Sequence, residues 1–179
     1  MSLDLISPPM AEPVSLADLK EHLKIDGAAE DAVIAGLGVA ARQLIEARYR
    51  VALLPQIWRF ALDCAAEAPI VIPLSPVASI DAVGVTRNGV TETLSPASYE
   101  AQAGNVGRVR LKSPVAGGDD FDRVVISFTA GWPDAASVPD ALKLAIKIVA
   151  AHYYENREGE PTGPAALGAI LAPYRQVRL

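Results

Sequence analysis

The sequence predicts an α+β fold, in which an antiparallel β unit is inserted into a small α-helical bundle. Two observations carry this prediction. Apolar residues recur at helical spacing in the first and last thirds of the chain, whereas the middle third holds short β-like runs separated by turn residues. The 179 residues are 51% hydrophobic, which is enough for one compact domain with a buried core.

A first helix is predicted over about residues 16–25. Ser15 and Asp18 have the spacing of a capping box, in which the side chain of each residue bonds the backbone of the other. The apolar residues of one face are Leu16, Leu19 and Leu23. Prolines at positions 8, 9 and 13 keep the preceding residues extended.

A second, longer helix is predicted over about residues 31–49. Its apolar residues recur at steps of three and four, at Ile34, Leu37, Ala41 and Leu44. Gly36 and Gly38 either weaken this helix or allow another element to pack closely against it.

The β unit is predicted over about residues 55–130. Its β-like runs are residues 57–62, 70–72, 80–86, 109–111 and 124–129. Asn88 and Gly89, between Val85 and Thr91, are a specific hairpin signal, because both central residues of a type I′ turn need a positive φ. We therefore expect antiparallel pairing.

A third helix is predicted over about residues 139–158, with Pro139 at its first position. Its apolar residues are Leu142, Ile146, Val149 and Tyr153. Glycines and prolines between 159 and 164 then interrupt the chain, and we expect the segment beyond them to contribute little to the core. The predicted division is a domain of residues 1–160 and an extended C-terminal arm of residues 161–179.

The charges are distributed unevenly. The net charge is -5, and all 21 acidic residues lie within residues 1–160, whereas the arm carries only Arg175 and Arg178. Because affinity for the phosphate backbone comes mainly from Lys and Arg, an acidic body argues against stable binding of nucleic acid. DNA could still pass close to such a surface.

Cys64 is the only cysteine, which excludes an intramolecular disulfide and a cysteine-based zinc site and favours a reducing compartment. As a nucleophile it would need a base, and His22 and His152 are both remote in sequence. No apolar run approaches the roughly 18 residues that span a membrane, so we expect no membrane anchor. The usual phosphate-binding and nucleophile motifs are missing, and we expect no cofactor.

His152 and Glu155 are the best remaining catalytic candidates, because an i,i+3 pair on one helix face could supply two ligands to a metal. Two ligands do not make a site, so a packing role is the preferred interpretation. Asp119, Asp120 and Asp122 resemble a fragment of a calcium loop but lack the EF-hand spacing, which favours a solvated turn.

Four aromatic residues could form either an interaction surface or part of the core: Trp58, Trp132, Tyr153 and Tyr154. Their spacing fits both interpretations equally well.

Several stretches together resemble the phage head-tail connector (adaptor) family. They are Leu-Pro-Gln-Ile-Trp-Arg at 54–59, Pro-Leu-Ser-Pro-Val at 73–77 with Ser-Ile at 79–80, Phe-Thr-Ala-Gly-Trp at 128–132 with Val-Pro at 138–139, His-Tyr-Tyr-Glu-Asn-Arg-Glu at 152–158, and the ending at 171–175 with 177–179. They follow the family's order along nearly the whole chain. Residues 65–68 and 117–122 depart from its pattern.

The resemblance implies a structural, non-enzymatic protein of the virion neck that assembles in the host cytoplasm. Its copies would form a ring of about twelve subunits beneath the portal protein, as expected from the portal's cyclic symmetry. The ring would extend the DNA channel toward the tail and meet a tail-side completion or terminator protein. DNA would pass through without specific binding.

Within this framework, the C-terminal arm is the predicted portal-binding element. The residues expected to make the contact are Tyr174, Arg175, Val177, Arg178 and Leu179. A second hypothesis is that the helical bundle contacts neighbouring subunits, while the β unit faces the outside of the ring or its tail side.

Two alternatives remain open from the sequence. One is a head- or tail-completion protein of the same neck, since similar small folds recur at successive levels of such particles. The other is a small metal-dependent enzyme built around His152, Glu155 and the loop at 119–122, which would contain stoichiometric metal.

Overall fold

The structure is a computed structural model that describes residues 1–63, 69–113, 124–156 and 167–174. It has the predicted α+β fold, with helices and two antiparallel sheets in the described part of the chain. The chain forms two compact units. The β unit comprises Met1–Met10 and Pro55–Pro133, and the helical unit comprises Ala11–Leu54 and Asp134–Leu179.

Helix α1 (Leu16–Leu23) begins with the predicted capping box. The Asp18 N–H donates to Ser15 Oγ over 3.1 Å, and the Asp18 carboxylate accepts from the Ser15 N–H over 3.3 Å. The helix ends earlier than predicted because Lys24 adopts a left-handed conformation, with φ of 56°. The Ile25 N–H then bonds back to the Lys20 carbonyl over 3.0 Å, which closes the last turn.

Helix α2 (Asp31–Tyr49) has the predicted bounds but a different buried face. The apolar residues that it buries are Ile34, Gly38, Ala41, Ile45 and Tyr49. Leu37 and Leu44, expected on the core side, are only half-buried. The prediction failed there because α2 is apolar on more than one face, so that spacing alone does not identify the core side.

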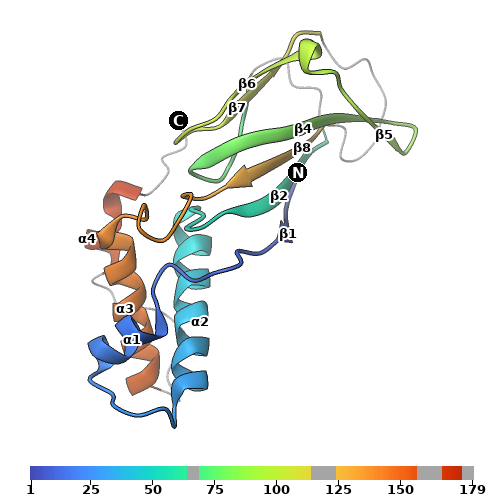
Figure 1. Ribbon diagram of the computed structural model, residues 1–179. Coiled ribbons are helices and arrows are strands. Elements are labelled where there is room, and N and C mark those ends of the chain that lie inside the picture. Colours follow the sequence, from blue (N-terminus) through green and yellow to red (C-terminus); the bar gives the residue numbers. More distant parts are fainter. Residues whose placement is uncertain (64–68, 114–123, 157–166, 175–179) are drawn as a thin grey trace. The chain divides into compact units, whose positions relative to one another are not determined.

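Helix α3 (Asp140–Glu155) lies alongside α2 (Figure 1) and buries Leu142, Ile146 and Val149 against the core of the helical unit. Near its end the Tyr154 hydroxyl donates to the Glu30 carboxylate over 2.6 Å, immediately before α2 begins. The two helices therefore run antiparallel. After α3 the described chain resumes with the short helix α4 (Leu167–Ile170) and the 3-10 turn η2 (Ala172–Tyr174).

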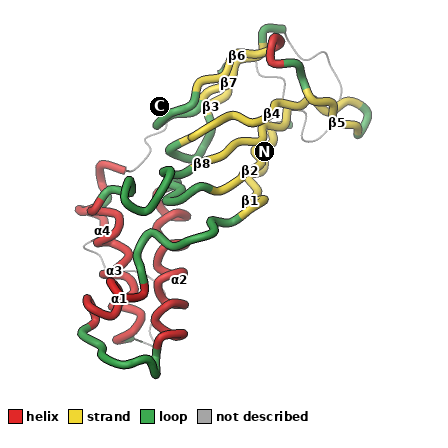
Figure 2. The backbone as a smooth tube through the Cα atoms, viewed as in Figure 1, coloured by secondary structure: helices red, strands yellow, loops and turns green. Residues whose placement is uncertain are grey.

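The β unit holds both sheets (Figure 2). The five-stranded sheet has the order β1-β2-β8-β4-β5, and the three-stranded sheet has the order β3-β7-β6. The strands are β1 (Ser2–Ser7), β2 (Gln56–Leu62), β3 (Ile70–Val71), β4 (Val77–Arg87), β5 (Val90–Thr93), β6 (Tyr99–Gln102), β7 (Arg108–Leu111) and β8 (Val124–Ala130). The 3-10 turn η1 (Pro96–Ser98) precedes β6. Central strand β8 carries much of the core, including the fully buried Ile126 and Phe128.

Strands β1, β5 and β6 were not among the predicted β-like runs, although the hairpin signal implied a strand after Gly89. Strand β1 pairs antiparallel with β2, so the first residues are part of a sheet and not merely extended. Edge strands such as β1 and β5 bury little, and every residue of β5 is exposed. An edge strand therefore lacks the apolar run that marks a central one. Strand β6 is also mostly exposed.

The hairpin signal at Asn88-Gly89 is confirmed. Arg87 pairs with Val90 across a two-residue turn, in which Asn88 has φ of 51° and Gly89 has φ of 76°. Both angles are positive, as a type I′ turn requires.

Candidate functional site

The predicted portal-binding segment begins as part of the helical unit. Leu167 and Leu171 are 1% and 0% exposed, and the Leu171 N–H bonds to the Leu167 carbonyl over 2.9 Å. The expectation that this segment adds little to the core is therefore wrong for its described part. Two buried leucines four residues apart fix one turn of helix to the unit, despite the Gly/Pro break that precedes them.

Of the five predicted portal-binding residues, only Tyr174 is described. It is half-buried at the end of η2, where its N–H bonds to the Leu171 carbonyl over 3.0 Å. Arg175, Val177, Arg178 and Leu179 lie outside the described residues. Tyr174 is therefore the last described residue of the segment.

The candidate metal pair does not gain further ligands in the described part of the chain. His152 Nδ1 lies 3.2 Å from the side-chain nitrogen of Asn156, which also donates to the His152 carbonyl over 2.9 Å. This contact ties the imidazole to the end of α3, while Glu155 is exposed. Among the described residues, no three His, Cys, Asp or Glu side chains are close enough to hold a metal ion. Cys64 and the aspartates at 119, 120 and 122 lie outside these residues.

The four aromatic candidates are all half-buried, two in each unit. Trp58 lies on β2 opposite Leu5 of β1 and Phe128 of β8, and its buried Nε1 has no hydrogen-bond partner in the described structure. Tyr154 uses its hydroxyl to bond Glu30. Most of the surface of each of these four residues is therefore covered by other residues of the protein.

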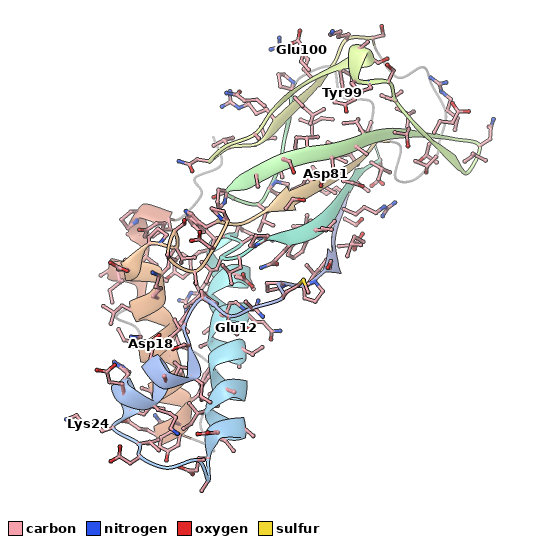
Figure 3. All side chains as sticks on the ribbon, viewed as in Figure 1. Glu12, Asp18, Lys24, Asp81, Tyr99 and Glu100 are labelled. Carbon is pink, nitrogen blue, oxygen red and sulfur yellow. The ribbon has the colours of Figure 1, made fainter. Side chains whose placement is uncertain are left out.

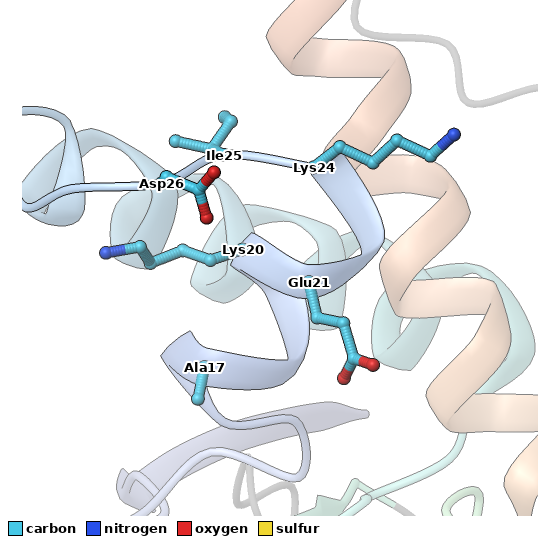
Figure 4. A pocket seen from close by; sticks show the side chains of 6 residues that line it. All are labelled: Ala17, Lys20, Glu21, Lys24, Ile25 and Asp26. Atoms are coloured by element: carbon cyan, nitrogen blue, oxygen red, sulfur yellow. The ribbon is translucent and has the colours of Figure 1, made fainter.

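A surface hollow beside α1 offers little to a small ligand. Figure 4 shows the six residues that line it, Ala17, Lys20, Glu21, Lys24, Ile25 and Asp26, none of which is buried. The Lys20 ammonium is engaged by the Asp31 carboxylate at 2.7 Å and by the Gly27 carbonyl. Ligand sites usually combine an enclosed apolar wall with a few fixed polar groups, and this hollow lacks that wall.

A buried ion-pair cluster holds the chain before α1 against α2. Arg42 is 6% exposed, and its guanidinium contacts the Glu12 carboxylate at 2.8 Å and the Glu46 carboxylate at 2.6 Å. Figure 3 shows Glu12 beside α2. Glu46 also accepts the Leu53 N–H over 2.9 Å. Burial alone would lower the pKa of Arg42, but Glu12 and Glu46 outweigh it and raise this pKa, so the guanidinium stays charged.

The most unusual surface is the side of α2 that faces away from its core. We call it the α2 outer stripe; its members are Val33, Gly36, Leu37, Ala40, Leu44 and Ala47. All are apolar or glycine, and all are exposed or half-exposed. Val33, for example, is 49% exposed. Sequence reasoning missed this stripe, although the absence of charge from 32 to 41 was a signal.

Helix α3 has a shorter surface of the same kind. We call it the α3 outer stripe, and it consists of Leu144, Ile148 and Ala151. Leu144 is 45% exposed, and the other two are half-exposed. Exposed apolar patches on a folded protein commonly mark contacts with other proteins or with membranes. None of the helices in the described part of the chain is long and apolar enough to cross a membrane.

Comparisons with known proteins give a consistent result at the level of structure. No protein-family profile matches the chain, and no curated protein matches it in sequence. The chain is similar to a chain in the neck of an empty gene transfer agent (GTA) particle computed with C6 symmetry, with a TM-score of 0.82 and 26% identity. It is also similar to a chain in the virion of a native GTA particle, with a TM-score of 0.81 and 27% identity.

A third similar chain belongs to the neck of a native GTA particle computed with C12 symmetry, with a TM-score of 0.79 and 24% identity. Each of the three alignments covers 100% of this chain and 97% of the other. The resemblance to neck proteins of phages and phage-like particles, first indicated by short sequence stretches, is therefore confirmed over the whole length of the chain.

Proposed function

We propose that the chain is a head-tail connector subunit, a structural protein whose copies form a ring between portal and tail and extend the DNA channel. The observation that supports this most is the whole-length similarity to chains from GTA neck and virion structures. The C6 and C12 symmetries of two of these structures also support a ring, because rotational symmetry places identical copies around one axis. The ring would hold about twelve subunits and assemble in the host cytoplasm.

The charge distribution suits a protein past which DNA moves. Every acidic residue lies before residue 161, and exposed carboxylates occur in both units, for example at Glu21, Asp26, Glu92 and Glu100. Figure 3 shows Glu100 on β6, next to Tyr99. Repulsion between such carboxylates and the DNA backbone prevents lasting contacts, so DNA passes without being held.

The portal contact is assigned to the end of the chain. Tyr174, Val177 and Leu179 would supply apolar anchors, and Arg175 and Arg178 would pair with acidic groups of the portal protein. The buried Leu167 and Leu171 support this arrangement because they fix the base of the segment to the helical unit. A short terminal segment then has less conformational freedom to lose on binding.

The test is co-elution of the purified chain with portal rings from the same particle. A truncation after Glu160 would also remove the buried leucines, so the informative truncation ends at Pro173. We expect the full-length chain to co-elute, and the chain ending at Pro173 or carrying Arg175→Glu and Arg178→Glu to lose binding. The matched control reverses two exposed arginines of the β unit, Arg87 and Arg108, and should bind normally.

Normal binding by the chain ending at Pro173 would contradict the assigned contact. If no form binds portal rings but the full-length chain binds a tail-side ring, the chain is a head- or tail-completion protein of the same neck. No observation on the described residues favours the metal-dependent enzyme over these structural roles, and metal analysis of the purified chain tests it directly.

A further inference from the structure

The helical unit has two apolar flanks. The α2 outer stripe lies opposite the residues that α2 buries, and the α3 outer stripe lies opposite the residues that α3 buries. Because α2 and α3 pack against each other through their buried sides, their outer stripes face away from each other. One copy of the chain therefore presents two different apolar surfaces on opposite flanks of the same unit.

We propose that the α2 outer stripe of one copy packs on the α3 outer stripe of the next copy around the ring. This inference rests on the proposed function and specifies how the subunits meet. A closed ring requires a heterologous contact, in which two different patches of the same chain meet. Two apolar flanks on one chain meet this requirement, and the portal contact is assigned to a different part of the chain, its C-terminal end.

The composition of the α2 stripe suits helix-to-helix packing. Gly36, Ala40 and Ala47 have small side chains or none. The surface of α2 is therefore lower at these positions than at Val33, Leu37 and Leu44. The distance between packed helices depends on side-chain size at the contact, and small residues allow a close approach. The larger Leu144 and Ile148 of α3 are then the side chains that fill those positions.

Charge at one end of the two stripes is also complementary. The antiparallel arrangement puts the end of α2 and the start of α3 at the same end of the helical unit. Exposed Arg48 lies at the end of α2, and at the start of α3 the Asp140 carboxylate is fully exposed, with Lys143 of the same helix 3.4 Å away. If neighbouring copies are related by rotation about an axis parallel to α2 and α3, the end of α2 in one copy lies at the same height along that axis as the start of α3 in the next. Arg48 of one copy would then face Asp140 of the next.

The experiment is thiol cross-linking in particles purified from cells that encode the chain. Cys64 is the only native cysteine, so a Cys64→Ser background has no other thiol. Ala40→Cys and Ile148→Cys place one thiol near the middle of each stripe. We expect a short bismaleimide to convert the double variant into a ladder of multimers, while either single variant stays monomeric.

Each result decides the inference. A dimer formed by Ala40→Cys alone would show that two α2 stripes meet, which overturns the heterologous contact. Presence of the double variant in particles without a ladder overturns the inference but leaves the proposed neck role intact. Absence of the Cys64→Ser chain and of the wild-type chain from the particles would overturn the neck role itself.

A charge substitution gives an independent readout. Val33→Glu introduces a carboxylate into the proposed contact, and we expect incorporation into particles to fall about tenfold or more, because an unpaired charge in an apolar contact is costly. The matched control is Val90→Glu on β5, where the native valine is 62% exposed and lies outside both stripes. Equal incorporation of the two variants would contradict the inference. Measured unfolding temperatures of both variants serve as the control that each remains folded.

Discussion

Leu19 of α1 packs so closely on Gly38 of α2 that a Cβ added at Gly38 would lie 2.7 Å from Leu19 Cδ1. The glycine is therefore part of the packing of the helical unit. Gly36, two residues earlier on the same helix, has no atom within 4 Å of such a Cβ. The two glycines of α2 thus serve different purposes, although they look equivalent in sequence.

The glycine pair gives a first prediction. Gly36→Ala should raise the free energy of unfolding by about 0.5–1 kcal/mol, because alanine is the better helix former and nothing obstructs it. Gly38→Ala should gain less or lose stability, because Leu19 must move aside. Urea unfolding followed by circular dichroism measures both. A larger gain from Gly38→Ala than from Gly36→Ala would contradict the packing described.

The buried ion-pair cluster gives a second prediction. Arg42→Met should lower the free energy of unfolding by about 3–5 kcal/mol, because it removes the buried guanidinium that contacts the Glu12 and Glu46 carboxylates. Arg48→Met, on an exposed position of the same helix, should change it by less than about 0.5 kcal/mol. Thermal and urea unfolding provide the comparison. Similar effects of the two substitutions would show that the cluster contributes little.

The capping box gives a prediction about pH. Hydrogen bonds from the Ser15 side chain and backbone favour the ionised form of Asp18 and lower its pKa from the ordinary value of 3.8. Because the pKa of Asp18 is lower in the folded chain than in the unfolded chain, the ionised carboxylate stabilises the fold at pH values above the unfolded-state pKa. This stabilisation is lost as the pH falls through the folded-state pKa. NMR titration should show a higher Asp18 pKa in Ser15→Ala. An unchanged pKa would refute the assigned cause.

The anchored C-terminal segment gives a fourth prediction. Leu171→Ala should lower the free energy of unfolding by about 2–5 kcal/mol, because Leu171 is fully buried and its truncation leaves a cavity. Truncation after Pro173 should leave the unfolding temperature nearly unchanged, because the leucines remain. A truncation as destabilising as Leu171→Ala would mean that the fold itself needs the last residues. Portal binding could not then be assigned to them by truncation.

The sequence predicted the elements that local chemistry specifies. Ser15 and Asp18 start α1, and Asn88 with Gly89 forms the β4–β5 turn, because each depends on residues only a few positions apart. The bounds of α2 were also correct. Its buried side was not, because a helix apolar on two faces needs its partners to be known before the core side can be identified.

The parts that were missed depend on contacts distant in sequence. Strand β1 is defined by its pairing with β2, 50 to 59 residues away, and as an edge strand it has only a weak apolar pattern of its own. Leu167 and Leu171 follow a Gly/Pro break, so only the structure reveals that they are buried. Both outer stripes likewise became visible only once the neighbours of each helix were known.

The most direct test of the neck role is electron microscopy of particles from cells in which the gene for this chain has been deleted. We predict filled heads and separate tails that fail to join, with joined particles restored when the full-length chain is supplied from a plasmid. Complete, tailed particles in normal numbers without the chain would contradict the account.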